Sequence, residues 1–149
     1  MNRQSGMTLI EVVISIVVIA IAVSAVLGVM SMTVQRSADA LVVSQAVSIA
    51  EAYVEEITLK PFVDPDGIDG EALRTNFDDM DDYDGLLDSG AFDQFGNAIS
   101  GLGDYTISVA VTPSAALPSL PAADVLRVDV RVQFAPYVDY MLSGYKTRL

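Results

Sequence analysis

The chain has 149 residues, 52% of them hydrophobic, and carries 8 basic against 20 acidic side chains, a net charge of −12. This length fits one domain of modest core rather than two, and the acidity argues against a nucleic-acid partner. The absence of cysteine and histidine excludes disulfides, Cys/His zinc sites, thiol nucleophiles and imidazole bases.

The hydrophobic residues and the acids lie in different parts of the chain. Residues 12–35 contain no charged side chain. As a helix, this segment rises about 36 Å, which is enough to cross a hydrocarbon core of about 30 Å. Arg3 precedes it, and positive charge ahead of an apolar segment favours a cytoplasmic N-terminus and export of the C-terminal part. The sequence therefore predicts a membrane segment joined to a water-facing head.

Three interpretations of the N-terminus remain open at this point. The apolar run is a secretory signal peptide cleaved after Val23-Ser24-Ala25, or it is a plain signal anchor. The third interpretation depends on Gly6, Met7 and Glu11: a glycine, an apolar residue, and a lone carboxylate at the edge of an apolar helix. A carboxylate in that place either reaches the membrane interface or has a partner, because an acid at the centre of a membrane helix costs about 2.5–3.5 kcal/mol.

The segment GMTLIEVVISIVVIAIAVSAVL, residues 6–27, resembles the N-terminal signature of type IV pilins and of the pseudopilins of type II secretion. The resemblance implies cleavage by a prepilin peptidase between Gly6 and Met7, followed by N-methylation of Met7, which stands where Phe is more common in the family. It also implies that Glu11, fifth in the mature chain, neutralises the N-terminal ammonium of a neighbouring subunit during assembly.

The helical pattern continues beyond the membrane segment. No proline occurs between Met7 and Lys60, and Lys60-Pro61 predicts the helix end, because the residue before proline avoids α geometry. The small residues Ala20, Ser24 and Gly28 lie four residues apart, which predicts a face on which membrane helices approach closely. The alternative is that this spacing arose by chance, since small residues are common in such segments. A second stripe at helical spacing is apolar and comprises Val34, Ala38, Val42, Ala46, Ile49, Tyr53 and Ile57.

The remainder of the chain predicts a small antiparallel sheet. Alternating patterns predict strands over 105–111, 126–134 and 138–147, with Gly144 as a bulge or bend in the last. A sheet of three or four strands packed on the helical stripe gives an α+β fold, which the pilin resemblance also implies. The predicted organisation is a leader at 1–6, a transmembrane and assembly helix at 7–35, its amphipathic continuation at 36–59, and a globular acidic head at 60–149.

Acidic residues concentrate in 64–93, where there are eleven against one base, Arg74. Oxygen-rich loops suit calcium, but an EF-hand loop counted back from Gly85 closes on Ala91 instead of glutamate. Crowded carboxylates repel one another rather than form an acid–base pair, so no enzymatic activity and no other cofactor are expected. Two alternatives remain, a solvated acidic loop or a calcium site formed from Asp78, Asp79, Asp81, Asp82 or Asp84.

Four segments of the chain are similar to those of minor pilins of the mannose-sensitive haemagglutinin type IV pilus. They are residues 74–85, 60–62, 93–97 and 144–148. The resemblance implies a minor structural subunit that is inserted in the bacterial inner membrane and then extracted into a pilus at the cell surface. Its implied partners are other pilins, the prepilin peptidase and the inner-membrane assembly platform. A minor pseudopilin of type II secretion and an exported binding module with a signal anchor are the alternatives.

Overall fold

A computed structural model of the chain describes residues 8–65, 67, 71 and 73–148, with residues 31–39 described by their backbone only. The chain divides into two compact units, residues 1–40 and 41–149. Its elements are the helix α1 (Leu9–Leu59), the strands β1 (Leu87–Ser89), β2 (Thr106–Pro113), β3 (Val125–Phe134) and β4 (Val138–Thr147), and short 3-10 helices at Arg74–Asn76, Asp81–Tyr83 and Ala122–Asp124.

In the first unit, the part of α1 between Val12 and Met30 carries no charged side chain. Leu9–Met30 is one stretch of 22 residues that is long and apolar enough to cross a membrane, and its most apolar window is not buried within the protein. Leu9, Ile21 and Val29 are each at least 65% exposed. A helix that is hydrophobic all round is stable when lipid or other helices surround it, so this stretch has the composition of a membrane-spanning segment.

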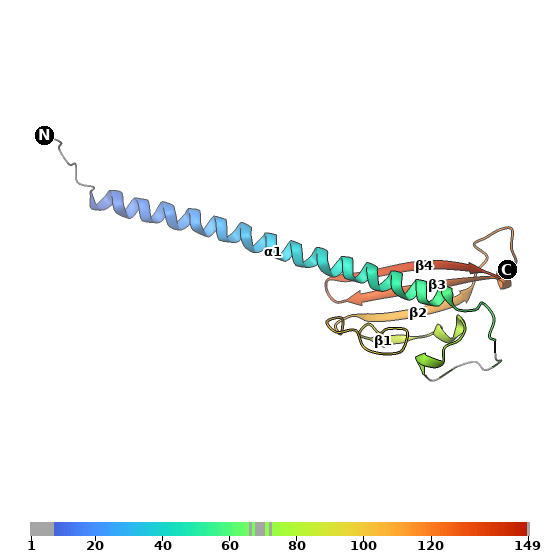
Figure 1. Ribbon diagram of the computed structural model, residues 1–149. Helices are drawn as coiled ribbons and strands as arrows, with labels where there is room; N and C mark the ends of the chain where they lie inside the picture. The colour runs from blue at the N-terminus through green and yellow to red at the C-terminus, as the bar shows by residue number, and fades with distance from the viewer. Residues whose placement is uncertain (1–7, 66, 68–70, 72, 149) are drawn as a thin grey trace. The chain divides into compact units, whose positions relative to one another are not determined.

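In the second unit, four strands form one sheet in the order β1-β2-β3-β4, with every neighbouring pair antiparallel (Figure 1). The strand alternation predicted for 126–134 is confirmed, because Val128, Val130 and Val132 are fully buried. Arg127 and Arg131, at the intervening positions, make ion pairs outside the core. The register places the buried valines of β3 opposite Val111, Val109 and Ile107 of β2, respectively.

The part of α1 after residue 40 covers the apolar face of the sheet (Figure 1). The predicted stripe is confirmed from Val42 onward, whereas Val34 and Ala38 lie outside the described side chains. The helix ends at Leu59, as Lys60-Pro61 predicts. The resulting fold is α+β. The helical residues of the core are Ala46, Ile49, Ala50, Tyr53 and Ile57, with Val42 and Val54 partly buried beside them.

Gly144 is not a bulge or bend, and that prediction is wrong. It sits in regular register opposite Val128. A Cβ atom added at Gly144 would lie 2.8 Å from Cγ1 of Val54, a distance that side chains do not tolerate without movement. The glycine is therefore needed because β4 approaches α1 closely at this point, and its absent side chain makes room for the helix.

The close approach of β4 to α1 gives a testable prediction. Gly144→Ala is expected to lower the free energy of unfolding by about 1–3 kcal/mol, the usual cost of overpacking. Combining it with Val54→Ala should cost less than the sum of the single changes by about 1 kcal/mol. All six tyrosines lie in residues 41–149, so their near-ultraviolet circular dichroism during urea unfolding reports on this unit. If the changes in unfolding free energy of the two single variants simply added, the proposed clash between position 144 and Val54 would be contradicted. Gly103→Ala is the control, since its added Cβ meets no atom within 4 Å.

Candidate functional site

The amino end of α1 places Glu11 in the first helical turn. The carbonyl oxygen of Thr8 accepts the backbone N–H groups of Glu11, at 3.1 Å, and of Val12, at 3.2 Å. Glu11 is the acid of this first turn, and its side chain is exposed. A carboxylate at a helix N-terminus is stabilised by the helix dipole, and exposure leaves it open to a cation from another molecule. Gly6 and Met7, the expected cleavage and methylation residues, lie outside the described residues.

The small-residue face of α1 is formed by Ala20, Ser24 and Gly28, which share one side of the helix because they are four residues apart. The Ser24 hydroxyl donates to the carbonyl oxygen of Ala20 at 2.8 Å, so its polarity is satisfied within its own helix. A Cβ added at Gly28 would meet no atom within 4 Å. The face is therefore small and exposed in this chain, and its role in helix packing stays a prediction.

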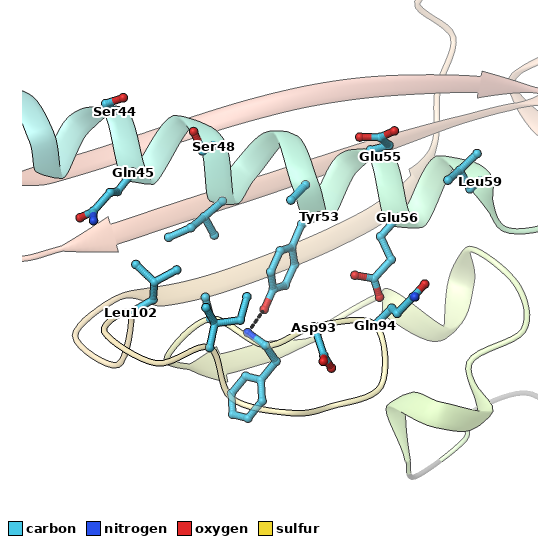
Figure 2. Close-up of a pocket in the computed structure, with 15 residues that line it drawn as sticks. Ser44, Gln45, Ser48, Tyr53, Glu55, Glu56, Leu59, Asp93, Gln94 and Leu102 are labelled. Carbon is cyan, nitrogen blue, oxygen red and sulfur yellow. Dashed lines mark hydrogen bonds between the residues drawn. The ribbon is translucent and has the colours of Figure 1, made fainter.

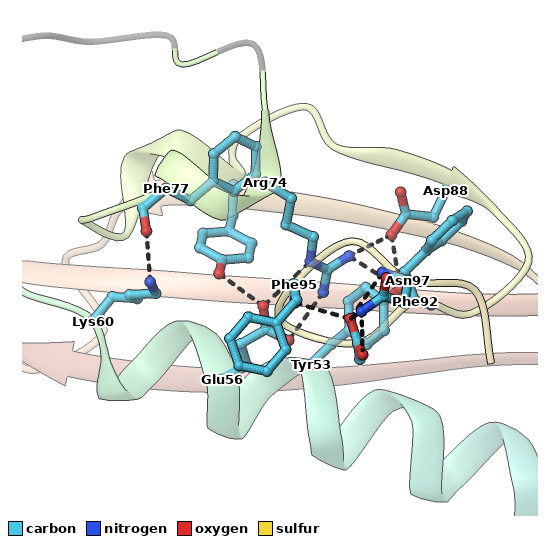
Figure 3. A network of polar contacts seen from close by, with 11 residues as sticks. Tyr53, Glu56, Lys60, Arg74, Phe77, Asp88, Phe92, Phe95 and Asn97 are labelled. Carbon is cyan, nitrogen blue, oxygen red and sulfur yellow. Dashed lines mark hydrogen bonds and ion pairs between the residues drawn. The ribbon is translucent and has the colours of Figure 1, made fainter.

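In the head, Arg74 is the centre of a buried polar cluster (Figure 3). Its guanidinium pairs with Glu56 of α1 at 3.0 Å and with Asp88 of β1 at 2.7 Å, and the three side chains are at most 14% exposed. It also lies over the ring of Tyr53, 4.6 Å from the centroid, in a cation–π contact. The cluster thus joins the helix to β1 through one cation. Removing that cation would leave two buried carboxylates without their counter-charge.

Two tyrosines complete this cluster. Tyr53 donates to Asp88 at 2.7 Å and accepts the backbone N–H of Phe92 at 3.0 Å, while Tyr83 donates to Glu56 at 2.8 Å. Burial, together with the hydrogen bond to Asp88, raises the pKa of Tyr53 to about 12. Burial and the hydrogen bond to Glu56 likewise raise the pKa of Tyr83. Both phenols keep their protons at neutral pH and act as hydrogen-bond donors, so the cluster is a structural clasp.

Arg74 stands out in the sequence, but its partners do not. Glu56 is 18 residues away and Asp88 is 14 residues away, distances that no local pattern predicts. The available signal was the isolation of Arg74 among eleven acids, because a lone base in an acidic segment has many potential counter-charges.

The acidic residues of the head are arranged differently from the predicted calcium set. The structure brings carboxylate oxygens of Glu71, Asp78 and Asp82 within 4.8 Å of one another. Asp84 instead accepts the backbone N–H of Val111 at 2.8 Å and so holds the loop against β2. Glu71 was not in the predicted set, because it precedes Asp78 by seven residues. Calcium binding by these acids stays a prediction.

Local hydrogen bonds hold the acidic loop in shape. Asp82 accepts the backbone N–H groups of Asp78, at 2.9 Å, and of Asp79, at 3.3 Å, while Asp79 accepts that of Asp82 at 3.2 Å. Asp79 is only 2% exposed. Its burial, aided by the charges of Asp81 and Asp82, raises its pKa to about 6. The hydrogen bond between the carboxyl groups of Glu71 and Asp82 raises the pKa of Glu71 to about 7.

Comparison with known proteins bears on the amino-terminal part of the chain. Residues 1–27 match the prokaryotic N-terminal methylation motif. The match supports a type IV pilin-like protein. No curated protein and no solved structure matches the chain.

The motif and the helix geometry agree with each other. The matched residues include the first turn of α1 with Glu11 and most of the exposed apolar stretch Leu9–Met30. Together they fit a membrane-anchored subunit of the prepilin-processed type that assembles with other pilins. The motif indicates a structural subunit rather than an enzyme.

The raised pKa values of Glu71 and Asp79 predict how stability depends on pH. Both exceed the ordinary values of 4.5 and 3.8, so between about pH 5 and pH 7 the native state binds more protons than the unfolded state. Stability is therefore expected to rise as the pH is lowered from about 7.5 to about 5. The urea midpoint, followed by the tyrosine circular dichroism, measures this change.

A variant and a pH limit control this prediction. The stability of the double variant Glu71→Gln/Asp79→Asn should depend less on pH across the same range. An unchanged dependence would contradict the assignment of the effect to these two side chains. The pKa values of Asp93 and Asp139 are lowered, by hydrogen bonds from Asn97 and Arg131 respectively. The stability they contribute is lost only on further acidification, below about pH 4, so they do not obscure the effect.

Proposed function

We propose that this chain is a minor structural subunit of a type IV pilus, of the kind found in the mannose-sensitive haemagglutinin pilus. A prepilin peptidase cuts between Gly6 and Met7, Met7 is N-methylated, and α1 carries the subunit from the inner membrane into the fibre. The observation that carries the proposal is the placement of Glu11 in the first turn of an exposed 22-residue apolar stretch, within the methylation motif.

The proposed role of Glu11 follows from electrostatics. In a fibre, the apolar stretches of neighbouring subunits exclude water, and an isolated carboxylate there is costly. The N-terminal ammonium of an adjacent subunit is a cation that compensates this charge, and N-methylation leaves it positive. Because attraction between unit charges strengthens as the dielectric constant falls, the pair contributes most after the subunits have left water and lipid headgroups behind.

A minor pseudopilin of type II secretion is the second candidate, since it would share the motif and the helix. The two candidates differ in the apparatus that contains the chain. Co-isolation with sheared surface fibres supports the pilus. Retention with the secretion machinery, with no chain in the sheared fraction, supports the pseudopilus.

The mature N-terminus tests the processing step. Mass spectrometry of the chain purified from its native membrane is expected to show N-methyl-Met7 as the first residue. A chain that begins at Val26 would instead indicate an ordinary signal peptide and an exported module. A chain that retains residues 1–6 would also contradict the proposal, because its amino group would lie six residues too early to meet Glu11 of a neighbour.

Replacing Glu11 tests the assembly step. Glu11→Ala is expected to leave membrane insertion intact and to reduce incorporation into fibres by about tenfold or more. A tenfold loss corresponds to about 1.4 kcal/mol, which is less than the 3–5 kcal/mol typically lost when one member of a buried ion pair is removed. The ratio of fibre-bound to membrane-bound chain, measured by immunoblotting, gives the result.

The same substitution at another acid controls for the loss of charge. Glu51 is exposed on α1 within the second unit, so Glu51→Ala is expected to assemble like the unaltered chain. Normal incorporation of Glu11→Ala would remove Glu11 from the mechanism. An equal defect in both variants would mean that a general change in charge, rather than a specific pair, controls assembly.

A further inference from the structure

A groove of about 620 Å³ lies within the second unit, between α1 and the loop that connects β1 to β2 (Figure 2). Residues of α1 from Ser44 to Leu59 form one side, and residues from Ala91 to Leu102 form the other. Ser44 and Leu59 are 15 positions apart, which is about 22 Å along a helix. A groove of this length suits an extended or helical polypeptide segment better than a compact small molecule.

The lining of the groove is apolar with an acidic component. Leu59 is 77% exposed and Ile99 is 44% exposed, so both present apolar surface to an occupant. Glu55 is exposed, and Asp93 is half-buried across the groove on the loop. None of the 15 residues that line the groove is Lys or Arg. A complementary segment would thus combine apolar side chains with at least one basic side chain.

Net charge argues against a second copy of this chain as the occupant. Residues 41–149 contain 6 basic and 18 acidic side chains, which accounts for the whole net charge of −12. Each of these six cations already bonds within the unit: Arg74 to Glu56 and Asp88, Arg127 to Asp129, Arg131 to Asp139, Arg148 to Asp124, Lys60 to the carbonyl of Phe77, and Lys146 to the carbonyls of Thr58 and Lys60.

These engaged cations make self-association through the groove unfavourable. Residues 41–149 of a second copy would have to break an internal bond in order to offer a cation to Glu55, and they would bring a like charge of −12. Like charges suppress association, whereas a partner of opposite charge is steered toward the surface. The occupant that fits is a different protein.

We propose that the groove between α1 and the 91–102 loop binds an amphipathic segment of a different protein, one that presents apolar side chains together with a Lys or Arg directed at Glu55. The proposal concerns the head alone and is independent of processing at Met7. It implies that the groove places the second unit beside an unlike protein.

Site-specific crosslinking of the full chain in its native membranes tests the proposal. The chain has no cysteine, so Ser48→Cys, at an exposed position in the groove, accepts a single maleimide–benzophenone photocrosslinker. The expected product joins this chain to a different polypeptide. Mass spectrometry of the crosslinked peptide is expected to show Lys or Arg beside apolar residues. Ser119→Cys, at an exposed position outside the groove, controls for random collisions.

Charge reversal then tests the role of Glu55. Adding Glu55→Lys to the Ser48→Cys chain is expected to reduce the crosslinked product by about fivefold or more, because attraction becomes repulsion. Asp81→Lys, the same change at an exposed acid outside the groove, is expected to leave the yield nearly unchanged. Tyrosine circular dichroism verifies that both variants are folded.

Several results would overturn the proposal. These are crosslinks from Ser48→Cys to a second copy of this chain or to lipid alone, the absence of any protein crosslink, or equal effects of Glu55→Lys and Asp81→Lys. The mature N-terminus is measured on the same sample. A chain that begins at Met7 but gives no groove crosslink refutes this inference alone and leaves the proposed function intact.

Discussion

The structure depends on one helix, α1, whose two parts carry different patterns of side chains. Up to Met30, α1 presents apolar side chains in every direction, so it is stable only where lipid or other helices replace water. From Val42 onward it buries one stripe against the sheet and exposes polar residues on the other side. The change from an all-round to a one-sided pattern separates a stretch with the composition of a membrane-spanning segment from the part of α1 that packs on the sheet.

The head is organised around the part of α1 that it covers. The valines of β2 and β3 form cross-strand pairs on the face toward the helix, and Gly144 allows β4 to approach Val54. Arg74 adds a polar link between α1 and β1. Apolar packing supplies most of the stabilisation, and the directional Arg74 contacts specify how the segment before the sheet is attached.

The separation of charge follows the same division. Residues 1–40 carry two basic and two acidic side chains, whereas residues 41–149 carry the full charge of −12. No side chain between Glu11 and Arg36 is charged, so lipid around this stretch would not have to accommodate a charge. An acidic head remains soluble and repels its own copies. Within the head, the raised pKa values of Glu71 and Asp79 favour the uncharged forms of these two side chains. This reduces the repulsion among the crowded carboxylates.

The sequence alone determined the helix, its end at Leu59, the alternation of β3 and the methylation motif, because each depends on residues close together in the chain. It did not predict β1, an edge strand of only three residues, and it misjudged Gly144. The partners of Arg74, the grouping of Glu71 with Asp78 and Asp82, and the groove beside Glu55 were decided by the tertiary structure. Each of these joins residues from separate segments, and only the packing of the sheet on α1 brings those segments within contact distance.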